Sequence, residues 1–529
     1  MNRYYKPITG MMKKKLVFLL LLLVSVTSFS STTETLPTHH WAYKIIDEMQ
    51  ARGFLLDLSQ LNLPYTRGQI ARALVEMEKP NGIAGQWYEM LESEFNPEIH
   101  EWIEPVNDQQ SVNIRLKVNS NLDHNPDKDL EYKGIYRGGV GINLAKNFYA
   151  YSGVNFNQYD VDNPDYVGYE WRGITGYTEQ AYVAFRNDRF YLKFGRDFIK
   201  WGAGYSGKLV MSDIARPLDM LYAGAKVGPF RYSFFASQLD DLEKYTLDSN
   251  NSLPIRRFLS GHRLDVLLWG GKLQASVTEL MLYGGAGETF NPVYINPFIF
   301  WHGAHKNGTI TLGNVLPTLD LLYYINSKFN VYGSLLIDDI QIEKTGPVDL
   351  EPNEIGLILG GRIAGPFQLS GLSLLAEYTR VTNRTYKTPS QVETFLQRGK
   401  PLGHPLGNDF DHLLLRTNYW LNPGLRLQLD LGYTRHGEGS IYSPWDAPWF
   451  NYTIDEGYSE PFPTGVVEKN KSVNFSVLWY WQNYCRMYIQ LESDFITNRN
   501  NIAEKNDNLF SARFQLEFDY SRIFGIPTH

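Results

Sequence analysis

The sequence of 529 residues has only one cysteine, Cys485, and only one long apolar run. A single cysteine excludes a fold stabilised by disulfides, so we expect Cys485 to be a small packing residue. The apolar run lies near the amino terminus. Because a spanning helix needs about 20 apolar residues, transmembrane helices are excluded after that point. A transmembrane β-barrel escapes this test, because its alternating strands average to low hydropathy.

Motifs for catalysis and for metal binding are also missing. The sequence has no His-x-x-x-His or Cys-x-x-Cys spacing, which would indicate a metal site. We find no Ser/His motif of the kind that barrel lipases use. Two carboxylates suited to glycoside cleavage could be chosen anywhere among 57 acidic residues, so their presence indicates nothing. We therefore predict no catalytic residues, no metal and no cofactor, and we interpret the protein as a non-enzyme.

The amino terminus has the pattern of a secretory signal peptide. Three lysines at 13–15 precede the apolar run 16–26, and Ser28-Phe29-Ser30 follows as a small-x-small cleavage pattern. The run of 11 residues is too short to span a membrane. Cleavage after Ser30 would remove five basic residues and no acidic one, and would change the net charge from -7 to -12. Such an acidic, exported protein has no obvious attraction to nucleic acid, and we predict no nucleic-acid partner.

Residues 31–105 are predicted to form a small periplasmic helical domain. Apolar residues within 41–53 recur at helical spacing, and Gly53 ends the run. Thr66 and Gln69 have the spacing of a capping box at the start of a second helix. A third candidate helix contains Trp87.

This helical segment resembles an S-layer homology module at three places, which are His40-Trp41-Ala42, Gly53 and Thr66-Arg67-Gly68-Gln69. Such modules usually carry Thr-Arg-Ala-Glu and often come in three copies, whereas this chain has one copy with Gly68 and Gln69 substituted. The resemblance implies contact with peptidoglycan. The alternative, which we favour, is a helical plug or cap for the rest of the chain.

From residue 106 onward the apolar residues recur with period 2 instead of 3.6. In residues 425–431, for example, every second residue is Leu and the others are polar. The predicted strands have about 9–11 residues, the length of a tilted bilayer-spanning strand, and their ends are rich in aromatic residues. A soluble sandwich rarely exceeds about 250 residues. We therefore predict an all-β fold, a transmembrane antiparallel β-barrel of 16–18 strands over residues 106–529, in contact with outer-membrane lipid.

Long loops are expected near 197–228, 283–310, 381–411 and 434–470. The inward face of the barrel carries both signs of charge, which favours a lining of salt bridges over a strongly selective pore. The candidate lumen residues are Arg115, Lys117, Arg426, Asp430, Glu492, Arg513 and Glu517.

Residues 202–207 match the pattern G-x-G-x-x-G. A dinucleotide-binding fold would require a buried parallel strand before the match and a helix after it. Here residues 190–194 alternate, and Pro217 interrupts the stretch after the match. We interpret the glycines as allowing tight turns or close backbone packing.

The same stretch resembles the Wzi-type capsule assembly family of outer-membrane proteins. The matching residues are Trp201-Gly202-Ala203-Gly204-Tyr205, Gly207, Leu209, Ser212 and Ala215-Arg216-Pro217, followed by His262-Arg263-Leu264-Asp265, Tyr283-Gly284-Gly285, Asn291-Pro292 and Asn296-Pro297. The family more often has Pro where Ala203 stands. The resemblance covers roughly residues 106–529. It implies an eighteen-stranded barrel with a small periplasmic helical domain, and a lectin-like role in tethering exported capsular or exopolysaccharide.

A polysaccharide site needs flat aromatic rings, hydrogen-bonding side chains for hydroxyls, and Arg or Lys for uronic acids. One stretch offers this mixture, and its candidate binding residues are Arg196, Asp197, Lys200, Trp201, Tyr205, Asp213 and Arg216. Alternatively, Trp201 and Tyr205 are membrane-girdle residues, and Asp213 and Arg216 form an internal ion pair that holds a loop. A rival site lies in loop 434–470, unless its aromatic residues only pack the loop. These are Tyr442, Trp445, Trp449, Phe450 and Tyr452.

The sequence thus predicts an outer-membrane barrel that binds exported polysaccharide and helps to assemble or retain a capsule. A porin or solute channel is the main alternative, and an outer-membrane enzyme acting on lipid or glycan is a third. Because the mature chain is acidic, binding of an acidic capsule would depend on a local basic cluster, such as Arg196, Lys200 and Arg216.

Overall fold

The computed structural model describes residues 32–104, 110–125, 128–145, 147–161, 163, 166, 168–242, 255–306, 313–342, 345–481 and 484–526. The predicted signal peptide, residues 1–30, lies outside this part of the chain. None of the helices in the described ranges is long and apolar enough to cross a membrane.

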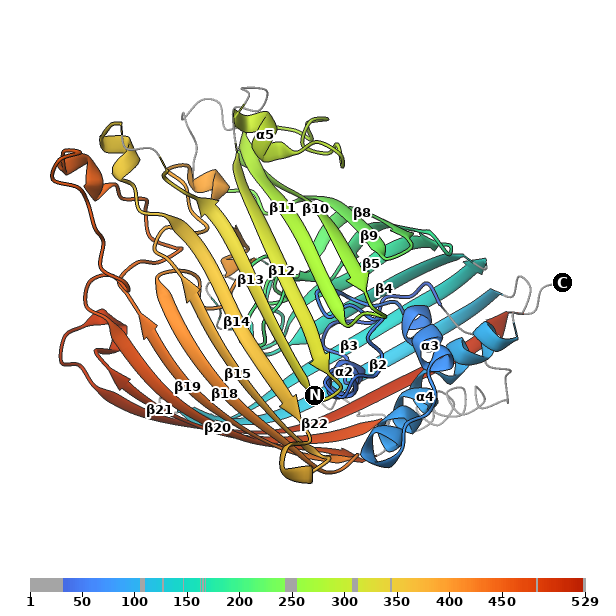
Figure 1. Cartoon of the computed structure of the whole chain (residues 1–529). Helices are drawn as coiled ribbons and strands as arrows, with labels where there is room; N and C mark the ends of the chain where they lie inside the picture. Colours follow the sequence, from blue (N-terminus) through green and yellow to red (C-terminus); the bar gives the residue numbers. More distant parts are fainter. Residues whose placement is uncertain are drawn as a thin grey trace, which may run out of the picture.

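Eighteen antiparallel strands of the described chain close into a barrel (Figure 1), within the predicted range of 16–18. They are β2 (Gln110–Asn125), β3 (Lys128–Ala145), β4 (Phe148–Asn157), β5 (Thr175–Arg186), β6 (Phe190–Asp197), β8 (Leu218–Val227), β9 (Phe230–Gln238), β10 (Ile255–Leu268), β11 (Leu273–Ala286), β12 (Asn314–Asn326), β13 (Phe329–Asp339), β14 (Glu354–Ala364), β15 (Leu372–Val381), β18 (Phe410–Asn422), β19 (Leu425–His436), β20 (Glu468–Trp481), β21 (Cys485–Thr497) and β22 (Asp507–Ile526). The first and last of them, β2 and β22, pair from Gln110 with Ile526 to His124 with Ala512 and close the ring.

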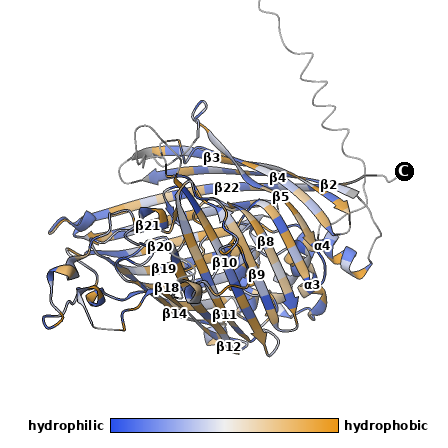
Figure 2. Cartoon of the chain, turned by 90° about the horizontal axis from the view of Figure 1, so that it is seen from above, coloured by the Kyte–Doolittle hydropathy of each residue, from blue (hydrophilic) through white to orange (hydrophobic). Residues whose placement is uncertain are grey.

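The two faces of the barrel wall differ in polarity, as the period-2 pattern predicts. Figure 2 shows hydrophobic and hydrophilic residues alternating along the strands. On β2, Leu116 is 52% exposed on the outer face, whereas Asn113 is buried on the inner face. An apolar outer belt suits lipid, in which a sheet must close to satisfy its edge amides. The closed barrel therefore excludes a soluble sandwich.

Turns at one end of the barrel are short, and most of the connections at the other end are long loops. The short-turn end includes the connections 228–229, 269–272 and 327–328. Segments 198–217 and 382–409 belong to the long-loop end. The predicted loop 197–228 is wrong from residue 218 onward, because β8 starts at Leu218, directly after Pro217. The long loops also hold the short elements β7 (Lys200–Trp201), α5 (Trp301–Lys306), β16 (Leu396–Gln397), β17 (Lys400–Pro401) and the 3-10 helices Pro347–Leu350, Gln391–Glu393, Pro448–Asn451 and Arg499–Asn501, while Pro366–Gln368 lies in a short turn.

The amino-terminal segment contains α2 (Ala42–Gln50), β1 (Asn62–Leu63), α3 (Arg67–Glu76) and α4 (Gly82–Ile103). The predicted capping box is present at the start of α3. The Gln69 amide donates to Thr66 Oγ1 at 3.2 Å, and the Thr66 amide donates to Gln69 Oε1 at 2.7 Å. These two bonds satisfy backbone donors that the first turn of a helix leaves free.

The helices pack onto the barrel and form a plug at the short-turn end (Figure 1). Trp87 of α4 meets Trp420 of β18 edge to face, with ring centroids 5.3 Å apart. Ion pairs also join the plug to the wall: Arg362 reaches Asp47 at 2.6 Å, and Arg115 reaches Glu34 at 2.8 Å. The plug interpretation of this segment is therefore confirmed, and its resemblance to a wall-binding module stays untested.

The inner wall has the predicted lining of salt bridges. Lys117 pairs with Glu517 at 3.1 Å and Arg513 with Asp123 at 2.7 Å. Both pairs join β2 to β22, so they also stabilise the seam of the barrel.

Candidate functional site

The segment 198–217, which we call the inserted segment, connects β6 to β8 and enters the lumen. Its strand β7 pairs antiparallel with β1 of the plug, Trp201 opposite Asn62 and Lys200 opposite Leu63. The Gly202 amide donates to Leu61 O at 2.9 Å. The stretch that carries the family resemblance is therefore attached to the amino-terminal plug.

Two carboxylates of the barrel wall hold the backbone of the inserted segment. Glu377 of β15 accepts hydrogen bonds from the amides of Tyr205 at 2.6 Å and Ser206 at 2.7 Å. Asp320 of β12 accepts from the Ala203 amide at 3.2 Å. Hydrogen bonds to an ionised acceptor are about twice as strong as neutral ones, so these contacts fix the path of the segment.

The glycines of the G-x-G-x-x-G match serve the backbone, as the sequence indicates. Gly202 and Gly204 have φ values of +111° and +115°, which favour glycine. A Cβ atom on Gly204 would lie 2.4 Å from the Gly207 carbonyl oxygen, and one on Gly207 would lie 2.3 Å from His404. Strand β8 follows the segment where a dinucleotide fold would have a helix.

A cavity of about 550 Å³ lies between the plug, the inserted segment and the barrel wall. Its size is within the range of about 300–1,000 Å³ that is usual for small-molecule sites. Aromatic rings reach it from all three parts of the structure. These residues are Tyr43 and Tyr65 of the plug, Tyr205 of the inserted segment, and Tyr332 and Tyr488 of the wall.

Tyr205 links the three parts that form the cavity. Its hydroxyl donates to Asp47 Oδ1 of the plug at 2.7 Å, and its ring lies 5.5 Å from the Tyr332 ring of the wall. Burial, together with the neighbouring Asp47 carboxylate, raises the pKa of Tyr205. The hydroxyl therefore stays protonated and acts as a donor.

Three of the seven predicted site residues line this cavity. They are Lys200, Tyr205 and Asp213, and Lys200 pairs with Asp213 at 2.9 Å. The other four are not among the residues that line it. Trp201 is fully buried beside the cavity, edge to face with Phe235 at 5.2 Å.

The remaining three predicted residues have ionic partners elsewhere. Asp197 is fully buried and pairs with Lys193. Arg196 lies on the outer face and pairs with Asp219. Arg216 lies 3.7 Å from Asp160.

These positions decide two alternatives that the sequence leaves open. Trp201 and Tyr205 are not girdle residues, since both lie within the lumen. Asp213 and Arg216 do not pair with each other, because Asp213 pairs with Lys200 and Arg216 with Asp160. Whether the seven residues bind polysaccharide stays a prediction.

Sequence reasoning missed several residues of the cavity. Lys208 follows Gly207 directly, within the stretch that resembles the family. Lys44 lies on α2, beside the buried Ile45. Alternation along β13 and β14 could have placed Tyr332 and Arg362 on the inner face, but only the tertiary structure shows which inward residues meet the plug.

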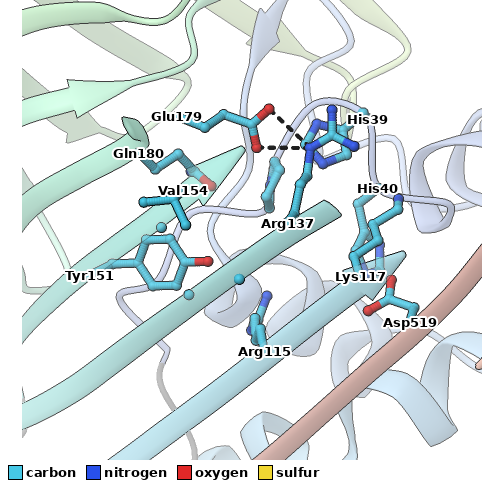
Figure 3. A pocket seen from close by; sticks show the side chains of 14 residues that line it. His39, His40, Arg115, Lys117, Arg137, Tyr151, Val154, Glu179, Gln180 and Asp519 are labelled. Atoms are coloured by element: carbon cyan, nitrogen blue, oxygen red, sulfur yellow. Dashed lines mark hydrogen bonds and ion pairs between the residues drawn. The ribbon is translucent and has the colours of Figure 1, made fainter. Parts of the chain in front are cut away.

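A second, smaller cavity lies between residues 37–40 and strands β2 to β5 and β22 (Figure 3). Its volume is about 50 Å³, enough for one or two water molecules but not for a sugar ring. Its cations are already paired. Arg137 donates to both oxygens of Glu179 at 3.0 Å, as Figure 3 shows, and Lys117 pairs with Glu517 at 3.1 Å.

The rival aromatic loop, residues 437–467, is partly packed and partly exposed. Trp449 is buried and lies under the Arg384 guanidinium at 4.9 Å. Tyr442 and Phe450 are exposed. The loop is therefore in part self-packed, and its residues do not line the cavity of about 550 Å³.

Comparison with solved structures shows the same fold in a protein from Escherichia coli. That protein is described as Wzi, an outer membrane protein involved in group 1 capsule assembly and a carbohydrate-binding β-barrel. It is 16% identical in sequence, with a TM-score of 0.62, and the match covers 92% of this chain and 99% of the other. Two outer membrane proteins of Pseudomonas aeruginosa, OpdK and OprD, match with TM-scores of 0.45 and 0.44 and identities of 9% and 10%. The matches cover 78% of this chain and 99% of OpdK, and 79% of this chain and 96% of OprD.

No curated protein matches the sequence significantly. The model of one protein family, described as Capsule assembly protein Wzi, matches residues 113–509. This range covers about three quarters of the chain, from β2 into β22. The chain therefore belongs to the Wzi capsule assembly protein family.

Proposed function

We propose that this outer-membrane barrel binds exported capsular or exopolysaccharide at the cell surface and helps to assemble or retain the capsule. The observation that carries the proposal is the cavity of about 550 Å³ formed where the inserted segment meets the plug. It combines flat tyrosine rings with charged and hydrogen-bonding groups, the mixture that a sugar site requires. Membership of the capsule assembly family supports the same function.

The loop lengths support an orientation for this barrel. Outer-membrane barrels have short periplasmic turns and longer extracellular loops. We therefore place the plug, residues 32–104, on the periplasmic side and the long-loop end outside the cell. The apolar outer face between the two ends contacts lipid. Contact of the plug helices with peptidoglycan rests on the S-layer resemblance alone and stays a prediction.

The function we propose is binding without catalysis. The inserted segment does bring a serine near a histidine, because Ser206 Oγ lies 3.4 Å from His404 Nε2. However, the Ser206 hydroxyl donates to Glu377. Burial lowers the pKa of His404 to about 3, which makes its imidazole a poor general base near neutral pH.

The proposal is tested by deleting the gene in its native strain and measuring the polysaccharide on cells and in the medium. We expect the deletion to move polysaccharide from the cell surface to the medium with total synthesis unchanged. In parallel, the purified protein should retain the strain's own polysaccharide on a column. Unchanged capsule retention, together with no binding of that polysaccharide, would contradict the proposal.

A further inference from the structure

We propose that the cavity beside the inserted segment is an anion site, which takes a sugar unit whose carboxylate or phosphate group enters among unpaired cations. This inference rests on the proposed function and names the chemistry of the bound unit. The observation that carries it is an excess of positive charge inside a protein whose net charge is negative.

The cavity is lined by six cationic side chains and three carboxylates. Each of the three carboxylates already forms an ion pair. Asp47 and Glu48 both pair with Arg362 at 2.6 Å, and Asp213 pairs with Lys200 at 2.9 Å.

A third cation, Arg416, pairs with Asp430 of the wall at 2.8 Å. Lys44, Lys208 and Arg426 then remain, and among the described residues none of them has a carboxylate within ion-pair distance. The three come from α2, the inserted segment and β19, so the plug, the inserted segment and the wall each contribute one of them.

The contacts of these three cations leave hydrogen-bonding capacity free. Arg426 is only 8% exposed, and its Nε has no hydrogen-bond partner in the described part of the chain. Lys208 Nζ donates to the Gly204 carbonyl at 2.8 Å, which uses one of its three donors. Lys44 Nζ lies 5.9 Å from the centre of the Tyr488 ring.

Leaving cations unpaired inside a protein is costly, because burial removes the water that stabilises their charge. A bound anion would supply the missing countercharge and accept charge-assisted hydrogen bonds. A neutral sugar would supply no countercharge, so the free-energy cost of the buried cations would remain. The geometry therefore selects an anionic sugar unit over a neutral one.

The smaller cavity of Figure 3 provides a comparison within the same lumen. Its cations Arg115, Lys117 and Arg137 each have a carboxylate partner at 2.8–3.1 Å. Basic residues in this lumen therefore do not generally lack a carboxylate partner. They occur together where the space is large enough for a sugar ring.

The test uses the full-length protein in detergent micelles and oligosaccharides prepared from the native strain's own capsule. Three samples are compared by calorimetry: untreated oligosaccharides, the same with carboxylates reduced to alcohols, and the same with phosphates removed by hydrofluoric acid. We expect one of the two treatments to weaken binding by about tenfold or more, the loss expected for charge-assisted hydrogen bonds. Which treatment does so distinguishes a carboxylate from a phosphate.

The variants Lys208→Gln and Lys44→Gln should lower the affinity for untreated oligosaccharides and leave the affinity for the neutralised ones unchanged. Both residues lie outside the barrel strands, so the barrel should still form, and circular dichroism checks this. Lys328→Gln, at an exposed lysine in the turn between β12 and β13, is the matched control. Equal binding of all three samples overturns the anion site and leaves the proposed function intact. Binding of none overturns both.

Discussion

At the scale of single residues, the side of the wall on which a charge lies determines its structural role. Asp197 faces the lumen, is fully buried, and accepts hydrogen bonds from Thr35 and Gln180 at 2.7 Å. It also pairs with Lys193. Asp219, opposite Arg196 on the neighbouring strand β8, has a side chain 59% exposed on the outer face.

We therefore expect Asp197→Ala to lower the free energy of unfolding by about 3–5 kcal/mol, because it leaves a buried lysine without a partner. Asp219→Ala breaks an exposed ion pair and should change the free energy of unfolding by less than about 1 kcal/mol. Unfolding by guanidinium of the protein in lipid vesicles measures the free energy of unfolding of both variants. Equal losses for the two would show that burial does not control these pairs.

Polysaccharide binding should also depend on pH through Lys44 of the plug. Burial, and then the nearby Arg426, lower the pKa of Lys44 to about 7. Lys117 and Arg486 act in the same direction, whereas Glu517 opposes them. In the free protein Lys44 is charged below about pH 7 and neutral above it, and an anion binds better to the charged form.

Affinity for acidic oligosaccharides should therefore fall as the pH rises from 6 to 8.5, and Lys44→Gln should make this fall smaller. A fall at the higher pH values should remain, because burial also lowers the pKa of Lys208, to about 8. Calorimetry at several pH values measures the affinity of the unaltered protein and of Lys44→Gln. A profile that Lys44→Gln leaves unchanged would contradict this role of Lys44.

At the scale of elements, the inserted segment should depend on Glu377 for its position. Glu377→Ala removes three hydrogen bonds from the inserted segment, donated by the amides of Tyr205 and Ser206 and by the Ser206 hydroxyl. A hydrogen bond to a charged group is worth about 1.5–3 kcal/mol. We expect trypsin to cleave after Lys208 at least about tenfold faster in this variant. Limited proteolysis with mass spectrometry measures the rate.

Glu279 of β11 offers a matched control for that experiment. It accepts hydrogen bonds from the amides of Trp301 at 2.9 Å and His302 at 2.7 Å, and so holds a different loop. Glu279→Ala should leave cleavage after Lys208 unchanged. Equal acceleration in both variants would indicate general loosening of the barrel.

Elements with a strong period could be predicted from the sequence, and contacts between distant segments could not. The alternation in 425–431 locates β19, and the spacing of Thr66 and Gln69 locates the start of α3. The predicted loop 197–228 extends too far, because the strand β8 begins at Leu218, directly after Pro217. The pairing of Lys200 with Asp213 depends on how the segment folds inside the lumen, which no local pattern encodes.

At the scale of the whole molecule, the plug and the inserted segment together argue against a wide channel. The family resemblance predicted the barrel and its helical domain, but the meeting of residues 62–63 with 200–201 in the lumen is a property of the three-dimensional fold. Side chains of the plug reach the wall through Asp47 and Glu34.

We expect the full-length protein to show little steady conductance in a planar bilayer. A variant that lacks residues 32–104 should conduct much better, because its lumen loses the plug. Single-channel recording of both proteins measures the difference. A large, steady conductance of the full-length protein would favour the porin alternative.

The pairing of β2 with β22 has a consequence for how the protein is made. The strand that completes the ring, β22, follows all the other barrel strands in the sequence, so a nascent chain acquires it after them. Until then the sheet has two free edges, whose amides cannot be satisfied in lipid. A prematurely terminated chain would therefore be unable to settle in the bilayer as a smaller barrel. We therefore expect insertion to require every strand of the ring, up to and including β22.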